Sequence, residues 1–242
     1  MKPTINSNAE PERLEEIVVK KDKDVEEVIK IYHESDFKYL RNKNWQDIRE
    51  TYRQKKTPIL TPTQIDLTLQ RIIQETTTEQ TNHSITGLYI TYLIQESYTA
   101  GNNNFTLNTK DTTIYALAHN LTGTKKQPIK LTINGNTNGW CGSDMKYSQL
   151  TINGNIGHWC GRNIEHSQLT INGDTGYLCG YRMKQSQLTI NGNTGNDCFQ
   201  YSTDSTINTN NLETYEKIKK QLAKGNKILL YDAQGNIIEQ HQ

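Results

Sequence analysis

The N-terminal part of the chain repeats apolar residues at the spacing of one helix face. Four segments carry the pattern: residues 23–35, 44–56, 61–75 and 84–97. In the first, Val25, Val28 and Tyr32 fall on one side of a helix. Thr61 followed by Pro62 is typical of an N-cap and a first helical position. We therefore expect amphipathic helices within residues 1–100, with the apolar helix from Ile85 to Leu93 covering the start of the next region.

From about Phe105 the pattern becomes a repeat with a period of nineteen residues. Within each unit, "LTIN" alternates apolar and polar residues, which is the periodicity of a β-strand. A strict period of this length predicts a solenoid, in which equivalent residues stack as columns. The inward columns are expected to contain Leu131, Leu150, Leu169 and Leu188, and Cys141, Cys160, Cys179 and Cys198.

Glycine returns at two positions of the repeat, and we interpret both as corners. The first position holds Gly135, Gly154, Gly173 and Gly192, and the second holds Asn138, Gly157, Gly176 and Gly195. Gly and Asn tolerate a positive φ, so the chain is expected to turn in that conformation at both positions.

The last unit departs from the repeat. Phe199 replaces a glycine, and Asp197 stands where earlier units have Trp140, Trp159 and Leu178. We interpret these changes as those of a terminal coil that no longer stacks.

The remaining residues predict a cap for the open end. "NNLETYEKIKKQLAKGN" predicts a helix that ends at Gly225, and "KILLYDAQGNIIEQ" predicts a hairpin around Gln234 and Gly235. The expected fold is α+β: a helical region over residues 1–100 that includes the N-terminal cap, a β-solenoid over 101–210, and a C-terminal helix and hairpin cap over 211–242.

The unit "LTINGDTGYLCGYRMKQSQLTINGN" resembles the repeat I-x-I-x-G-N-x-G-x-x-x-G-x-G-M-x-G-G of the GXGXG domain. That domain is a right-handed parallel β-helix found in the large subunit of glutamate synthase and in one of the subunits of formylmethanofuran dehydrogenase. The shared positions are Gly173, Gly176, Gly180, Met183, Leu188 and Ile190. Arg182 replaces the second Gly of G-x-G, while Gln185 and Ser186 replace the Gly pair. The resemblance implies a right-handed solenoid that serves as a scaffold beside the catalytic parts of an oxidoreductase complex.

Composition and charge narrow the choice of partners. A hydrophobic content of 33% is low for one ordinary globular core and fits a thin, elongated one. The formal net charge of +1 gives no overall attraction for nucleic acid or an anionic membrane. There is no run of eighteen apolar residues and no apolar signal core at the start, so we expect a cytoplasmic protein.

The four cysteines allow three interpretations: small apolar core residues, disulfides, or metal ligands. Metal sites usually use close pairs such as C-x-x-C, whereas eighteen residues separate neighbouring cysteines here. A cytoplasmic chain also keeps its thiols reduced. The first interpretation is therefore favoured, and we expect no metal and no cofactor.

The sequence contains no recognisable catalytic arrangement, because its histidines are scattered: His33, His83, His119, His158, His166 and His241. We therefore expect a non-catalytic scaffold or protein-interaction protein. The alternative is an accessory structural subunit of an oxidoreductase complex, as the resemblance suggests. A remote alternative is binding of ice or a polysaccharide through the outward rows of Thr and Asn, such as Thr170 and Asn172.

A protein partner is expected to contact the N-terminal aromatic residues, since aromatic side chains are enriched at interfaces. These residues are Tyr32, Phe37, Tyr39, Trp45 and Tyr52. The competing interpretation is that they close a small helical core.

Overall fold

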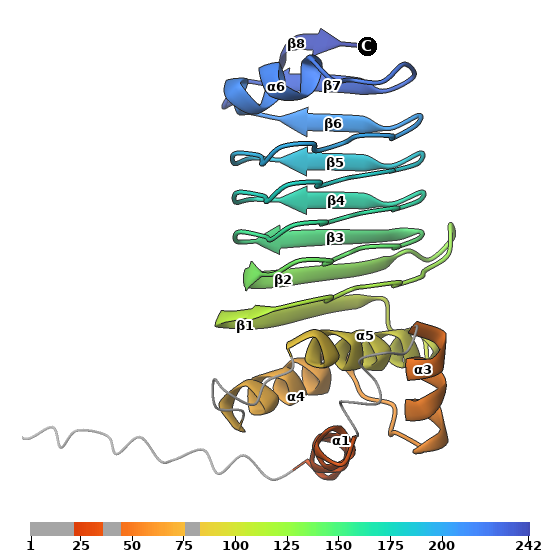
Figure 1. The fold of residues 1–242 in the computed structure, drawn as a ribbon. Coiled ribbons are helices and arrows are strands. Elements are labelled where there is room, and N and C mark those ends of the chain that lie inside the picture. The colour runs from red at the N-terminus through yellow and green to blue at the C-terminus, as the bar shows by residue number, and fades with distance from the viewer. Residues whose placement is uncertain (1–21, 36–44, 76–82) are drawn as a thin grey trace, which may run out of the picture.

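The computed structural model describes residues 22–35, 45–75 and 83–242, and it shows a helical region followed by a parallel β-solenoid of about six turns (Figure 1). The helices are α1 (Lys23–His33), α3 (Trp45–Gln54), α4 (Pro62–Glu75), α5 (His83–Thr99) and α6 (Leu212–Lys219). The strands are β1 (Asn104–Ile114), β2 (Ile129–Thr137), β3 (Ser148–Asn153), β4 (Gln168–Ile171), β5 (Gln187–Ile190), β6 (Thr206–Thr209), β7 (Lys227–Tyr231) and β8 (Ile237–His241). They form one sheet in sequence order, parallel up to β7 and antiparallel between β7 and β8. The predicted fold class is confirmed.

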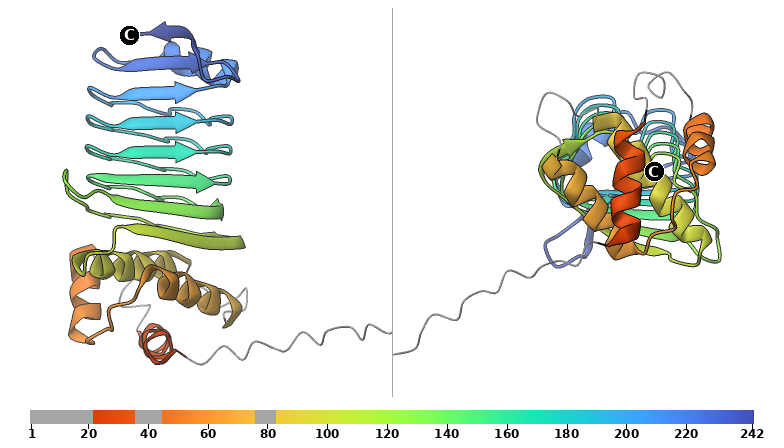
Figure 2. Two further views of the ribbon diagram at one scale, coloured as in Figure 1. Left: turned by 180° about the vertical axis from the view of Figure 1, so that it is seen from behind. Right: turned by 90° about the horizontal axis from the view of Figure 1, so that it is seen from below.

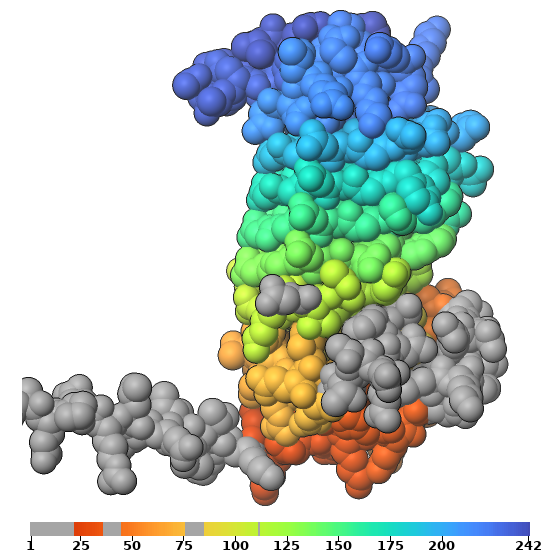
Figure 3. Space-filling model, turned by 60° about the vertical axis from the view of Figure 1, so that its left-hand side comes forward, coloured from red at the N-terminus to blue at the C-terminus, as the bar shows by residue number. Residues whose placement is uncertain are grey.

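The nineteen-residue period places identical residues side by side in neighbouring coils. Leu150 pairs with Leu131 below it and with Leu169 above it, and all three side chains are buried. The same column continues to Phe105 in β1 and to Ile207 in β6, where the repeat is no longer visible in the sequence. Consecutive coils contact one another along the face seen in Figure 3. The core is therefore long and thin, as the low hydrophobic content indicates.

The fourth repeat unit stacks like the others, so the prediction that it no longer stacks is wrong. The Phe199 N–H donates to the Cys179 carbonyl at 2.7 Å, and β6 pairs with β5. The Phe199 side chain is buried at this position. Asp197 has φ +56°, a conformation that Asp adopts more readily than most residues. Backbone hydrogen bonds hold the coils together, and these two changes leave them intact.

The glycines at the first corner position are required by close packing rather than by a positive φ, which corrects the prediction. Only Gly135 has a positive φ among the glycines of the two predicted corner positions. At Gly173 a Cβ atom would lie 2.5 Å from the carbonyl oxygen of Gly154 in the coil below, closer than real Cβ contacts. Positive φ occurs instead at the glycines after the cysteines, such as Gly161 with φ +60°.

A buried column of serines, which the repeat pattern alone did not reveal, links the coils along one side. The Ser167 N–H donates to the Ser186 hydroxyl at 3.1 Å, and that hydroxyl donates to the Lys184 carbonyl at 2.8 Å. Ser148 and Ser205 make the same contacts in their coils. The column therefore satisfies buried backbone groups that the strands leave unpaired.

Helices α4 and α5 cover the N-terminal end of the solenoid (Figure 2, right). Asp66 of α4 accepts hydrogen bonds from the backbone and side-chain nitrogens of Asn108, at 2.8 and 2.9 Å. Gln95 of α5 both donates to and accepts from the Thr122 backbone, at 3.0 and 2.9 Å. These side chains occupy an edge that would otherwise offer free backbone groups to another chain.

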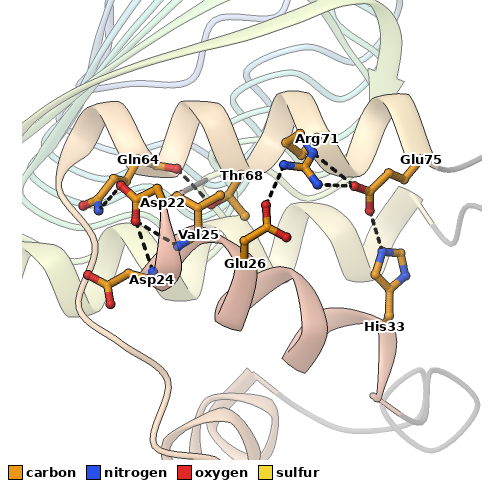
Figure 4. A network of polar contacts seen from close by, with 9 residues as sticks. All are labelled: Asp22, Asp24, Val25, Glu26, His33, Gln64, Thr68, Arg71 and Glu75. Atoms are coloured by element: carbon orange, nitrogen blue, oxygen red, sulfur yellow. Dashed lines mark hydrogen bonds and ion pairs between the residues drawn. The ribbon is translucent and has the colours of Figure 1, made fainter. Parts of the chain in front are cut away.

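Helix α1 is attached to α4 by a network of polar contacts (Figure 4). Arg71 binds Glu26 of α1 at 2.9 Å and Glu75 of its own helix at 2.8 Å, and Glu75 also contacts His33 at 3.0 Å. At the start of α4, the Thr61 hydroxyl accepts from the Gln64 N–H at 3.4 Å and the Thr61 N–H donates to the Gln64 side chain at 2.8 Å, which confirms the predicted N-cap.

Helix α6 and the hairpin cover the C-terminal end. Lys217 donates to the Thr194 carbonyl at 2.7 Å, and Gln221 donates to the Cys198 carbonyl at 2.9 Å. The helix ends at Lys219 rather than at Gly225, because the chain leaves the helix through further turns before it reaches that glycine. The hairpin between β7 and β8 is where the sequence predicts it.

Candidate functional site

One corner of the solenoid exposes large aromatic side chains on an unusual backbone. Trp140 and Trp159 occupy the same position of consecutive coils and have φ values of +64° and +60°. For a bulky L-residue this conformation is unfavourable by about 1–2 kcal/mol. Backbone hydrogen bonds between coils hold it, since the Trp140 N–H donates to the His158 carbonyl at 3.0 Å. The coil thus forces both indoles onto the outside, where 39% of Trp140 is exposed.

The side chains at this corner stack along the solenoid axis. The Trp140 and Trp159 rings lie 5.6 Å apart and 13° from parallel, and the Arg162 guanidinium lies over both, at 5.3 and 5.7 Å. Two tyrosines continue the series edge to face, at 5.5 Å from Trp159 to Tyr181 and 5.4 Å from Tyr181 to Tyr201. We call this surface the aromatic corner; it consists of Trp140, Trp159, Arg162, Tyr181 and Tyr201.

A groove of about 580 Å³ opens where the aromatic corner meets the helical region. We call it the tryptophan groove, and its principal lining residues are Trp45, His119, Asn120, Trp140, Asp144 and Arg162. Trp45 comes from α3 and meets His119 edge to face at 6.3 Å. The three tryptophans of the chain therefore lie at this junction, two in the groove wall and Trp159 stacked on Trp140.

The polar groups of the groove carry little net charge. Burial lowers the pKa of His119; the nearby Asp144 opposes this shift, and Arg162 adds to it. The imidazole is therefore neutral at pH 7, and its Nδ1 lies 3.9 Å from Asp144 Oδ2, too far for a hydrogen bond. Asp144 Oδ1 accepts from Asn163 at 2.9 Å. The charges of Arg162 and Asp144 offset each other.

Two buried nitrogen atoms at the groove lack a hydrogen-bond partner within the described part of the chain: His119 Nδ1 and Arg162 Nε. The lining combines aromatic faces with planar polar groups, a combination that is typical of small-molecule binding sites.

The aromatic residues predicted to contact a partner have different environments in the structure. Tyr32 and Tyr52 are buried; the Tyr32 hydroxyl bonds that of Thr86 at 2.6 Å, and the Tyr52 ring lies 4.6 Å from Tyr89. For these two, the structure agrees with the competing interpretation of a helical core. Trp45 is partly buried and lines the tryptophan groove. Phe37 and Tyr39 lie outside the described residues.

The cysteine column is buried and its thiols are free. Burial raises the pKa of Cys141 to about 12, and it also raises the pKa of Cys160 well above its usual range. At neutral pH these side chains are neutral thiols, which are poor nucleophiles and poor metal ligands. Among the described residues, no group of three or more His, Cys, Asp and Glu side chains is placed to hold a metal ion.

The outward Thr and Asn rows form an ordered polar face. Asn172 donates to Asn153 at 2.7 Å and accepts from Asn191 at 2.7 Å, so the amides form a ladder along the axis. Asn153 and Asn172 therefore each use one N–H donor and the oxygen of the side-chain amide within the protein itself.

Sequence reasoning missed the aromatic corner because it compared what the units share. Trp140 and Trp159 stand at a position that changes from unit to unit, and Arg162 meets Trp140 only once the coils are stacked. The signal in the sequence was a pair of tryptophans at one repeat position in a chain with three in all.

Searches against protein-family models, curated proteins and solved structures find no match to this chain. The resemblance to the GXGXG domain therefore rests on the repeat pattern alone, while the β-solenoid itself is shown by the fold. No helix in the described ranges has the length and apolar character needed to span a membrane.

Proposed function

We propose that this chain is a non-catalytic binding protein in which a capped β-solenoid holds the aromatic corner as a rigid recognition surface. The observation that carries the proposal is the pair of tryptophans, Trp140 and Trp159, at positive φ. Gly or Asn would occupy this position with less strain. Leu178 and Asp197 stand there in later coils, also at positive φ, so the conformation belongs to the coil and the two indoles are what the first units add to it. Residues kept in an unfavourable conformation are concentrated at functional sites.

The scaffold supports such a role because its ends are covered. Asp66 and Gln95 bond the backbone of the first coil, and Lys217 and Gln221 bond that of the last repeat unit. A solenoid with covered ends remains a rod of fixed length instead of growing by edge pairing. Side chains on its corner keep a fixed spacing, which lowers the entropy cost of binding.

The other functions expected from the sequence have less support. Association with an oxidoreductase complex rests on the resemblance alone. Binding of ice or a polysaccharide through the Thr/Asn face has only the regularity of that face, and the amides of Asn153 and Asn172 are already bonded to each other.

The test uses tryptophan fluorescence, because the tryptophans of the chain lie at the site. The purified full-length protein is titrated with a panel of neutral and charged oligosaccharides, unmodified peptides and nucleotides. We expect at least one ligand class to change the emission, and the double variant Trp140→Ala/Trp159→Ala to bind that ligand at least tenfold more weakly in calorimetry. Tyr147→Ala is the matched control, because its ring stacks on His166 at 4.9 Å at a different corner.

Two results would contradict the proposal. One is that every ligand that binds has the same affinity for the wild type and for the folded double variant, so that none depends on the aromatic corner. The other is chemical conversion of the bound ligand by the protein, detected by mass spectrometry.

A further inference from the structure

We infer that the tryptophan groove binds one end of a neutral oligosaccharide, whose remaining sugars lie along the aromatic corner. This inference rests on the binding function proposed above and adds the class of ligand. Four features of the site support it: an open aromatic face, a polar rim, a near-zero local charge, and a series of rings that continues along the axis.

The aromatic face is open because of the residue beneath it. The Gly142 N–H donates to the Leu117 carbonyl, and the Ala116 N–H donates to the Gly139 carbonyl. These hydrogen bonds set the alignment of the first two coils, and in this alignment Ala116 lies below Trp140. Trp159 covers Trp140 from above, whereas Ala116 contributes only a methyl group below. The groove lies on this side, with Trp45 in the same lining.

An indole face suits a sugar ring. The axial C–H bonds of a pyranose form an apolar patch with partial positive charge, and the face of an aromatic ring is negative. The hydroxyl groups around the sugar then point sideways, toward the rim. A flat apolar platform with polar groups at its edge therefore matches the two kinds of surface that one sugar presents.

The rim of the groove supplies the hydrogen-bonding groups. Asn120 offers an amide, Asp144 offers its Oδ2 oxygen, and Arg162 carries guanidinium N–H groups beside Trp140. Planar amides, carboxylates and guanidinium groups can each bond two neighbouring hydroxyls. The neutral imidazole of His119 lines the same groove and adds no charge to it.

The charge of the groove favours an uncharged ligand. Arg162 and Asp144 offset each other and His119 is neutral, so neither a phosphate nor an ammonium group finds an unbalanced opposite charge. The Arg162 guanidinium is also placed over the faces of Trp140 and Trp159. A phosphorylated ligand would have to compete with these contacts and with Asp144.

The aromatic series gives the ligand a direction. From Trp140 the rings continue through Trp159 and Tyr181 to Tyr201, with 68% of Tyr201 exposed. These positions span three coil steps, or roughly 14 Å at about 4.8 Å per strand. Adding the groove, this length suits a chain of three or four sugars that runs parallel to the solenoid axis.

The experiment titrates full-length protein with neutral di-, tri- and tetrasaccharides of glucose, mannose and N-acetylglucosamine, with uronic-acid oligosaccharides and unmodified peptides for comparison. Calorimetry and tryptophan fluorescence give the dissociation constants. We expect a neutral tetrasaccharide to bind, and Trp140→Ala and Asp144→Asn each to weaken it by tenfold or more. Trp140→Tyr should restore part of the binding because it keeps an aromatic face, while the control Tyr147→Ala should bind like the wild type.

The length of the oligosaccharide gives a second, independent measurement. Tyr201→Ala should weaken the tetrasaccharide about threefold or more and leave the disaccharide unchanged, because only the longer ligand reaches that ring. Circular dichroism and thermal melting identify variants that fail to fold. If a variant does not fold, the wild-type protein alone still tests the inference, because its affinity should rise from the disaccharide to the tetrasaccharide.

The outcomes separate this inference from the proposed function. If peptides bind at the aromatic corner and no neutral oligosaccharide does, the saccharide inference is wrong and the binding function stands. If uronic-acid chains bind more tightly than neutral ones, the charge argument and with it the inference fails. If the folded protein binds none of the ligands at the corner, both proposals are wrong.

Discussion

Asn226 Oδ1 accepts a hydrogen bond from the Ser205 N–H at 3.1 Å, at the place where each coil below presents a serine hydroxyl. The Asn226 Nδ2 donates to the Ser202 carbonyl at 2.7 Å, and the side chain is fully buried. One amide from the loop after α6 thus ends the serine column and connects the C-terminal cap to the last repeat unit.

We expect Asn226→Ala to lower the free energy of unfolding by about 2–3 kcal/mol, because it leaves a buried N–H and a buried carbonyl without their partner. Urea denaturation followed by circular dichroism measures the change. The exposed Asn210 is the control, and Asn210→Ala should stay within about 0.5 kcal/mol of the wild type. Equal stability of the two variants would show that the serine column needs no terminating side chain.

The contact between Gly173 and the Gly154 carbonyl predicts different results for two glycines. Gly173→Ala places a methyl group 2.5 Å from that oxygen, so the coils must separate locally, and we expect a loss of about 3 kcal/mol. Gly235→Ala meets no atom within 4 Å and strains only its positive φ, for an expected loss of about 1 kcal/mol. The free energies of unfolding of the two variants are measured by thermal and urea denaturation. A larger loss at Gly235 would contradict the packing explanation.

The cysteine column should accept a small apolar side chain and reject a charge. Cys160→Val nearly keeps volume and polarity, so we expect a loss of less than about 1.5 kcal/mol. Cys160→Asp puts a carboxylate among buried side chains and should prevent folding or lower the stability severely. A disulfide revealed by a mass deficit, or stoichiometric metal in the purified protein, would overturn this interpretation of the column.

Alkaline pH should destabilise the protein through the same column. The pKa of Cys141 is raised by burial from 9.0 to about 12, so the unfolded chain ionises first and gains free energy as the pH rises. The contribution of this thiol to stability is fully present below pH 9 and is lost as the pH approaches 12. By pH 10 its ionisation in the unfolded chain has lowered the free energy of unfolding by about 1.4 kcal/mol.

Cys141→Val removes that contribution. The difference in unfolding free energy between pH 8 and pH 10, measured with urea, should be about 1.4 kcal/mol smaller in the variant than in the wild type. The same difference in both proteins would mean that the thiol ionises as easily in the fold as in the unfolded chain.

The repeat architecture could be predicted because its physical cause is local. Alternation in "LTIN" determines which side chains face inward, and the period then aligns Leu131 with Leu150 without further information. The role of the glycines could not be predicted in this way. A positive φ and a close approach of another coil select the same residue, so the sequence alone could not show that Gly173 serves the second purpose.

The candidate site depends on contacts between coils and between regions. Trp45 and Trp140 are distant in sequence and line the same groove only because α3 lies beside the first coils. Tyr52 was a candidate interface residue because its region is rich in aromatic side chains, with a helical core as the competing interpretation, and its ring packs against Tyr89 of α5. Neither relationship follows from the periodicity of a single segment.

Tyr201 offers a test of whether the aromatic corner is kept for binding at the expense of stability. Its φ is +57° and 68% of the residue is exposed, so it combines backbone strain with little burial. Asn adopts this conformation readily, and the strain relieved, about 1–2 kcal/mol, is on central values larger than the lost edge contact with Tyr181, about 0.5–1.5 kcal/mol. We expect Tyr201→Asn to raise the free energy of unfolding by about 0.5 kcal/mol.

Tyr177→Asn is the matched control, since Tyr177 is also exposed but lacks a positive φ and stacks on His158 at 3.7 Å. This variant loses a ring contact and relieves no strain, so its stability should fall. If Tyr201→Asn stabilises the protein and weakens the tetrasaccharide, the tyrosine is retained for its surface and not for the fold. If Tyr201→Asn destabilises the protein as much as Tyr177→Asn does, the backbone at the corner is not strained by large side chains, and Trp140 and Trp159 lose their status as evidence for a binding site.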